Sequence, residues 1–247
     1  MCKHADLIAH PTRPLSPLQW VSFEALVRRR EHGEPLAYIL GSAEFYGRQF
    51  VVAPAVLIPR PETELLVDLA IEHVHSQPGA RILDLGTGSG VLAVTLARLC
   101  PAALVAAVDL SSPALAVARD NAARHAVAVS FHVGDWYAPL GVSRFDLIVA
   151  NPPYVAQADP HLQNDGLPFE PQVALTDGVF GGDGLACIRA IIGGVAAHLR
   201  PGGCLLIEHG YDQATAVRQL LLKVGLSDVE SWRDLSKIER VSGARMH

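Results

Sequence analysis

Short apolar runs and segments with helical spacing alternate along the chain from residue 81 onward. The apolar runs are RILDL (81–85), LVAAVDL (104–110), VSFHV (129–133), FDLIVA (145–150) and CLLIEH (204–209). Runs of this kind, bounded by turn residues, are typical of strands buried on both faces of a sheet. The segments with helical spacing between them cover 91–99, 114–123 and 185–199. This alternation predicts an α/β domain with a doubly wound, mostly parallel sheet covered by helices on both faces.

The first 80 residues have a different pattern. Apolar residues over 15–31 have helical spacing and Ser16 can cap the first turn, so we expect a small amphipathic helix there. The stretch EFYGRQF predicts a β-hairpin that turns at Gly47, and the prolines that follow exclude a helix up to residue 60. A second helix is expected over 61–76. We therefore divide the chain into a small helical domain, a β-hairpin linker and a main domain, with bounds 1–40, 41–60 and 61–247.

Composition and charge narrow the class of protein. The chain has 247 residues, of which 50% are hydrophobic, and a formal net charge of -5. That balance supplies no basic field for direct binding of nucleic acid. The basic run Arg28 to Arg30 falls at an expected helix end, where cations favour the helix dipole. No apolar run approaches the roughly 18 residues that span a bilayer, and the N-terminus lacks the apolar core of a secretion signal, so we expect a cytoplasmic protein.

Cysteine and histidine usage argues against a metal site. The four cysteines are scattered, and no two of them have CxxC spacing. The eleven histidines include no HExxH motif. The sequence therefore predicts neither a disulfide framework nor a zinc site.

A glycine-rich loop follows the first apolar run, in the stretch DLGTGSG (84–90). Gly86, Gly88 and Gly90 allow a tight turn and a close approach of the backbone to a ligand, and the helix that follows offers unpaired N–H groups. The spacing departs from the dinucleotide fingerprint GxGxxG, because Val91 occupies the position of its last glycine. A strand-to-helix turn with no ligand is the alternative interpretation.

Polar residues also end the next two runs. Asp109 lies nineteen residues after Gly90, where a carboxylate can accept both hydroxyl groups of a ribose, although it could equally be a turn cap. Asp135 and Trp136 follow the third run. Asp135 could accept a proton of an adenine amino group, and Trp136 could cover the base or, alternatively, belong to the core.

The fourth run ends in Asn151, Pro152, Pro153 and Tyr154. The two prolines have no backbone N–H, which leaves carbonyl oxygens as the main-chain polar groups. The Asn151 side-chain oxygen and the Pro152 carbonyl could then accept both protons of a planar NH₂ group, while Tyr154 offers a flat face. The motif therefore predicts a receptor for amides or amino-bearing rings, unless the prolines only shape a turn.

These motifs together resemble the class I S-adenosylmethionine-dependent methyltransferases. More specifically, the chain resembles the bacterial release factor glutamine N5-methyltransferases, the HemK family, from about Arg28 to Val241. The likeness rests on RRREHGEPLAYILGSAEFYGRQF, VLIPRPETE, DLGTGSG, FDLIVANPPY, FEP and LRPGGCLLIEHG. The resemblance implies a seven-stranded sheet and methylation of the glutamine in the GGQ motif of class 1 peptide chain release factors. It also implies S-adenosyl-L-methionine as methyl donor, S-adenosyl-L-homocysteine as product, and we expect a monomer.

The resemblance also assigns roles to residues. The cofactor would be held by Gly86, Thr87, Gly88, Ser89, Gly90, Asp109 and Trp136. Asn151 would meet both methyl donor and substrate, with Pro152, Pro153 and Tyr154 gripping the glutamine. Arg60 and Glu62 would either line the site or form a hinge salt bridge. For Glu170 and Glu208, the only role that we can derive is to shape a loop.

Two questions stay open at this point. Only about 30 residues precede the RRxxGEP motif, so either the helical domain is reduced or the true start lies upstream of Met1. The substrate could also be the glutamine of ribosomal protein L3 or, with less support, an adenine N6 of DNA, which would call for a basic recognition domain. A non-catalytic binding module is the remaining alternative, and the intact NPPY motif argues against it.

Overall fold

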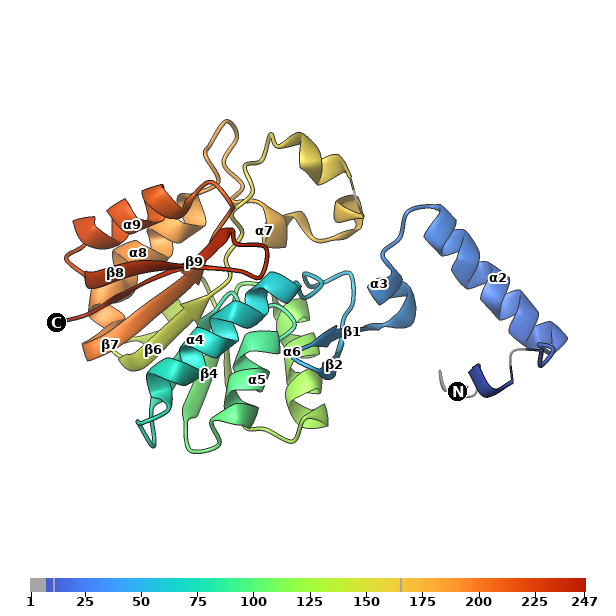
Figure 1. Ribbon diagram of the computed structural model, residues 1–247, viewed down its shortest axis with the longest axis horizontal. Coiled ribbons are helices and arrows are strands. Elements are labelled where there is room, and N and C mark those ends of the chain that lie inside the picture. Colours follow the sequence, from blue (N-terminus) through green and yellow to red (C-terminus); the bar gives the residue numbers. More distant parts are fainter. Residues whose placement is uncertain (1–7, 11, 165) are drawn as a thin grey trace.

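The computed structural model describes residues 8–10, 12–164 and 166–247. Its centre is a seven-stranded sheet with the order β5-β4-β3-β6-β7-β9-β8 (Figure 1). The strands are β3 (Arg81–Leu85), β4 (Leu104–Asp109), β5 (Ser130–Val133), β6 (Phe145–Ala150), β7 (Leu199–Glu208), β8 (Ser227–Arg233) and β9 (Glu239–Arg245). The neighbours from β5 to β7 pair in parallel, and β9 lies antiparallel between β7 and β8. The prediction of a mostly parallel sheet is confirmed, whereas the pattern did not predict the C-terminal hairpin.

Helices cover both faces of this sheet (Figure 1). Residues of α4 (Glu64–Val74), α5 (Val91–Leu99) and α6 (Ser112–Arg124) share one core cluster with Ile82. Residues of α8 (Ala186–His198) and α9 (Ala214–Lys223) share a second cluster with Leu83. Because successive strand side chains point to opposite faces, one apolar strand supplies both clusters.

The register of the sheet brings two loops to one edge. Leu85, the last residue of β3, pairs with Val108 of β4 and with Ala150 of β6. Parallel strands end at the same edge of a sheet, where such folds bind ligands. The glycine loop and Asn151 therefore leave adjacent strands side by side, as the sequence predicted.

The predicted hairpin is confirmed. It consists of β1 (Ser42–Phe45) and β2 (Arg48–Val51), with Gly47 in the turn at φ +67°. Phe45 and Phe50 are fully buried in the first core cluster, so the hairpin packs against the main domain. Shorter elements are α3 (Leu36–Leu40), η1 (Pro61–Thr63), η2 (Ala138–Leu140), η3 (Pro160–Gln163), η4 (Leu167–Phe169) and α7 (Gln172–Leu175). The helix expected over 61–76 is thus a 3₁₀ turn followed by α4, which already ends at Val74.

The first long helix, α2 (Pro17–Glu31), begins where the pattern predicts, because Ser16 and Gln19 form a capping box. The predicted helix is present, but it buries no apolar face against the described residues. None of its residues is buried, and Leu18 keeps 83% and Val21 64% of its surface exposed. The helix points away from the sheet domain (Figure 1), so its apolar side chains have no core to join among the described residues. The spacing of apolar residues alone does not show whether another element packs against that face of the helix.

Candidate active site

The glycine loop between β3 and α5 is held against the neighbouring strand. Gly86, Gly88 and Gly90 have φ of +74°, +56° and +82°, a region in which side chains other than glycine are strained. The N–H groups of Gly86 and Thr87 both donate to the carbonyl of Val108, at 2.9 and 3.0 Å. The glycines are therefore needed for the shape of the loop itself.

One glycine is also needed because another helix approaches closely. A Cβ on Gly90 would lie 3.0 Å from the Cβ of Ala118 on α6. From the same helix, the Asn121 amide donates to the carbonyls of Ser89, at 2.8 Å, and Val51, at 3.0 Å. Asn121 is fully buried and links the loop to the hairpin. No motif in the sequence pointed to it.

Asp84 holds the loop from beneath. Its Oδ2 accepts hydrogen bonds from the Thr87 hydroxyl, at 2.6 Å, and from the N–H of Ala93, at 3.2 Å. Its Oδ1 is buried and has no hydrogen-bond partner among the described residues. Burial raises the pKa of Asp84 to about 7, since desolvation disfavours the charged form.

Asp109 meets the loop from the neighbouring strand. Its Oδ2 accepts from the N–H of Gly88, at 2.7 Å, and its Oδ1 accepts from the N–H of Ser111, at 2.8 Å. Burial raises its pKa, partly offset by these two backbone hydrogen bonds. These two contacts are those of the cap interpretation. Each carboxylate oxygen has a second lone pair, so hydroxyl groups of a ligand can still be accepted.

The third strand end contributes an aromatic wall. Trp136 has φ +41° and is partly buried against the second core cluster. A Cβ on Gly86 would lie 3.5 Å from its ring, so the indole stands directly over the glycine loop. Asp135 is exposed next to it. The structure brings Trp136 to the predicted site while it also contributes to packing.

The NPPY segment is anchored by contacts that the sequence did not predict. The Asn151 Nδ2 donates to the Thr63 hydroxyl at 3.0 Å, which leaves its Oδ1 free to accept from a substrate. The Tyr154 hydroxyl donates to Glu208 Oε1 at 3.2 Å. The Tyr154 carbonyl accepts from Gln213 Nε2 at 3.0 Å. Both polar side chains of the motif are thus preset before any ligand binds.

The IPRPETE segment (58–64) contains a salt bridge, but its partners differ from the pair Arg60 and Glu62 that the sequence suggested. Arg60 pairs with Glu170 at 2.5 Å, not with Glu62. The other oxygen of Glu170 accepts from the N–H of Ile58 at 2.9 Å. Glu170 is 4% exposed. It therefore ties the segment before α4 to the FEP loop, which gives the loop-shaping role of Glu170 a partner.

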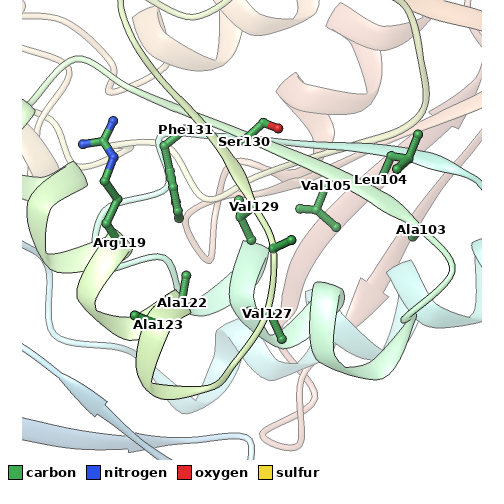
Figure 2. Close-up of a pocket in the computed structure, with 11 residues that line it drawn as sticks. Ala103, Leu104, Val105, Arg119, Ala122, Ala123, Val127, Val129, Ser130 and Phe131 are labelled. Atoms are coloured by element: carbon green, nitrogen blue, oxygen red, sulfur yellow. The ribbon is translucent and has the colours of Figure 1, made fainter.

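A groove of about 530 Å³ lies between α6 and the amino ends of β4 and β5 (Figure 2). The Arg119 guanidinium stands 5.6 Å from the centre of the Phe131 ring on its wall. Leu104 and Val129 add apolar surface. The groove lies at the edge of the sheet opposite the two loops, so it is not part of the candidate active site.

Other site types are not represented in the part of the chain that the structure describes. No group of three or more His, Cys, Asp or Glu residues there is arranged to hold a metal ion. Cys100, Cys187 and Cys204 are free thiols, and Cys2 lies outside the described residues. Within the same ranges, none of the helices has the length and apolarity to cross a membrane.

The strand order, the glycine loop after β3, the acid after β4 and NPPY after β6 define a class I S-adenosylmethionine-dependent methyltransferase. Two family models match the chain, the methyltransferase small domain over residues 63–164 and the PrmC N-terminal domain over residues 1–41. A Thermus thermophilus 16S rRNA methyltransferase structure matches with a TM-score of 0.61 at 22% identity, over 83% of this chain and 50% of that one. At that identity the likeness concerns the fold.

Relatives with higher sequence identity identify the family. A release factor glutamine methyltransferase of Bordetella pertussis is 50% identical over 97% of this chain and 88% of its own length. The corresponding protein of Burkholderia pseudomallei is 49% identical over 98% and 86%. The structure of a release factor-specific protein-(glutamine-N5) methyltransferase from Alicyclobacillus acidocaldarius is 31% identical, with a TM-score of 0.50, over 80% of this chain and 99% of that one. The chain belongs to the release factor glutamine methyltransferase family.

Proposed function

We propose that the protein transfers a methyl group from S-adenosyl-L-methionine to the side-chain amide nitrogen of the glutamine in the GGQ motif of class 1 peptide chain release factors. Family membership supports the substrate. The observation that carries the chemistry is the preset amide of Asn151, whose NH₂ group is engaged by Thr63 at 3.0 Å beside the glycine loop. We expect the protein to act as a monomer in the cytoplasm.

The residues at the strand ends fit the cofactor. The loop has positive-φ glycines that allow close backbone approach, an acid at its side and the Trp136 ring above Gly86. The cofactor-binding set would be Gly86, Thr87, Gly88, Ser89, Gly90, Asp109, Asp135, Trp136 and Asn151. When bound, the cofactor supplies an electrophilic methyl group, and the electron pair of the broken S–C bond stays on sulfur in S-adenosyl-L-homocysteine.

The residues of the protein would act by orienting the amide of the substrate glutamine. An amide nitrogen is a poor nucleophile, because its lone pair is delocalised into the carbonyl. Acceptance of both N–H protons by Asn151 Oδ1 and the Pro152 carbonyl raises electron density on that nitrogen and aims it at the methyl group. Pro153 and Tyr154 would complete the grip on the glutamine. Positional effects of this kind remove about 7–11 kcal/mol of a barrier at best, and the proton leaves only after the nitrogen has become cationic.

A parallel methylation assay tests this proposal. Radiolabelled S-adenosyl-L-methionine is offered with a class 1 release factor, with ribosomal protein L3 and with adenine-containing DNA. We expect label on the release factor, located on the GGQ glutamine by mass spectrometry of the peptide. A release factor with that glutamine replaced should stay unlabelled. Label on L3 or DNA alone would refute the substrate, and the DNA result would also refute the glutamine chemistry.

A further inference from the structure

One buried carboxylate beside the candidate active site has no part in the chemistry described so far. Glu208 is the last residue of β7 and is 1% exposed. Its neighbour Ile207 pairs with Ala150 at the end of β6. Glu208 therefore lies beside the start of the NPPY segment, at the edge of the sheet where the two loops meet. Burial of a carboxyl group is costly unless its hydrogen bonds serve the structure or the reaction.

Glu208 contacts one polar side chain of NPPY directly, and a second residue, Thr63, holds the other. Its Oε1 accepts from the Tyr154 hydroxyl at 3.2 Å. The Thr63 hydroxyl is among the groups that lower the pKa of Glu208, although the two side chains form no hydrogen bond of ordinary geometry in this structure. Thr63 in turn accepts from Asn151 Nδ2 at 3.0 Å. The Oε2 atom is buried with no partner in the geometry of the described residues, which leaves it open as an acceptor.

The single proton of Thr63 decides how Asn151 is oriented. A hydroxyl group has one proton to donate and two lone pairs to accept. If that proton is attracted to the Glu208 carboxylate, the Thr63 oxygen can only accept, and it must face the NH₂ end of Asn151. The carbonyl end of Asn151 then faces the substrate. A flipped amide would present two protons to a substrate NH₂ group and would repel it.

We propose that Glu208 is a positioning residue, which sets the amide orientation of Asn151 through Thr63 and holds the ring of Tyr154 through its hydroxyl. This role rests on the proposed function, because it matters only if a substrate NH₂ group is the ligand. It goes beyond the loop-shaping role that the sequence supports. Glu208 itself touches neither substrate nor cofactor in this scheme.

The charge of Glu208 adds a pH dependence. Burial raises the pKa of Glu208 to about 7. The hydroxyls of Thr63 and Tyr154 and the charge of Arg240 on β9 oppose this increase, whereas the charge of Glu62 on η1 adds to it. Burial and Glu208 raise the pKa of Tyr154, which therefore remains a donor. The ionised carboxylate can accept from both hydroxyls, whereas the protonated form loses an acceptor. Turnover should therefore rise with pH through about 7.

Three variants test this role. Thr63→Val removes the hydroxyl at nearly constant volume, Thr63→Ser retains it, and Glu208→Gln retains the shape of the carboxyl group without its charge. We expect Thr63→Val and Glu208→Gln to lower kcat for release factor methylation about 10- to 100-fold, the scale of a misplaced reacting group. The dissociation constant for S-adenosyl-L-methionine, measured by calorimetry, should stay near the wild-type value. Thr63→Ser should restore most of the turnover.

The pH profile separates positioning from a merely structural role. Wild-type kcat should rise through about pH 7, and Glu208→Gln should lack this rise. Folded Thr63→Val and Glu208→Gln with wild-type kcat, or a Glu208→Gln profile like that of the wild type, would overturn the role of Glu208. A wild-type protein that binds the cofactor but methylates no release factor would instead overturn the proposed function.

Discussion

The amide of Asn151 and the hydroxyl of Thr63 lie 3.0 Å apart, although 88 residues separate them in the chain. The contact joins the IPRPETE segment to the NPPY segment. It explains why the two motifs belong to one site, since the first fixes which end of the Asn151 amide faces outward from the second.

Replacement of Asn151 tests whether the protein is an enzyme or a scaffold. We expect Asn151→Ala to lower turnover by about 100-fold or more, because a preset hydrogen-bonding group at the reacting centre is lost. Cofactor binding should persist, at least weakly, because the glycine loop is unchanged. Labelled methyl transfer and calorimetry measure the two effects. The exposed Asn164 provides the control Asn164→Ala, which should behave as wild type. Turnover in Asn151→Ala equal to wild type would favour the scaffold interpretation.

Two glycines in one loop form a matched pair. Gly184 and Gly181 have φ of +75° and +69°, so alanine is similarly strained at both. A Cβ on Gly184 would lie 2.3 Å from the Tyr154 carbonyl oxygen, whereas nothing lies within 4 Å of one on Gly181. Gly184→Ala must therefore displace Tyr154. We expect its kcat to fall about 10- to 100-fold, with Gly181→Ala close to wild type in the same assay. Equal kcat values for the two variants would contradict this prediction.

Asp84 should make stability depend on pH. Its pKa is raised from 3.8 to about 7 by burial, so the folded state retains the proton more strongly than the unfolded state. The stabilisation is present below the unfolded pKa and is lost as pH rises through about 7. Asn cannot ionise, so the free energy of unfolding of Asp84→Asn, minus that of wild type, should increase from about pH 4 to about pH 8.

Urea unfolding without cofactor measures this difference across the pH range. The exposed Asp212 supplies the control Asp212→Asn, for which the difference from wild type should stay nearly constant. A constant difference for Asp84→Asn as well would show that Asp84 does not titrate in this range.

Removal of the Asp109 carboxylate should weaken cofactor binding. Asp109→Ala leaves the N–H groups of Gly88 and Ser111 without their partner and removes the acceptor proposed for the ribose hydroxyls. A loss of about 1–3 kcal/mol is expected, which corresponds to a roughly 5- to 150-fold higher dissociation constant by calorimetry. Asp120→Ala, on the exposed side of α6, is the control. Unchanged affinity in folded Asp109→Ala would refute the assignment of Asp109 to the cofactor site.

Local patterns in the sequence determined much of this protein. The apolar runs before Gly86 and Asn151 predicted two buried parallel strands, and the glycine loop and the NPPY segment predicted the class of site. The strands and the positive φ of the loop glycines are confirmed, because strand burial and backbone conformation are properties of a few consecutive residues.

Only the tertiary structure decided which distant groups meet. Arg60 finds Glu170 across 110 residues, and Tyr154 finds Glu208 across 54. The same holds for α2, whose apolar residues have helical spacing but no core to cover them within the described chain. Such partnerships depend on the order and register of the sheet strands and on the surface that each helix meets. Periodicity along the chain carries no information about either.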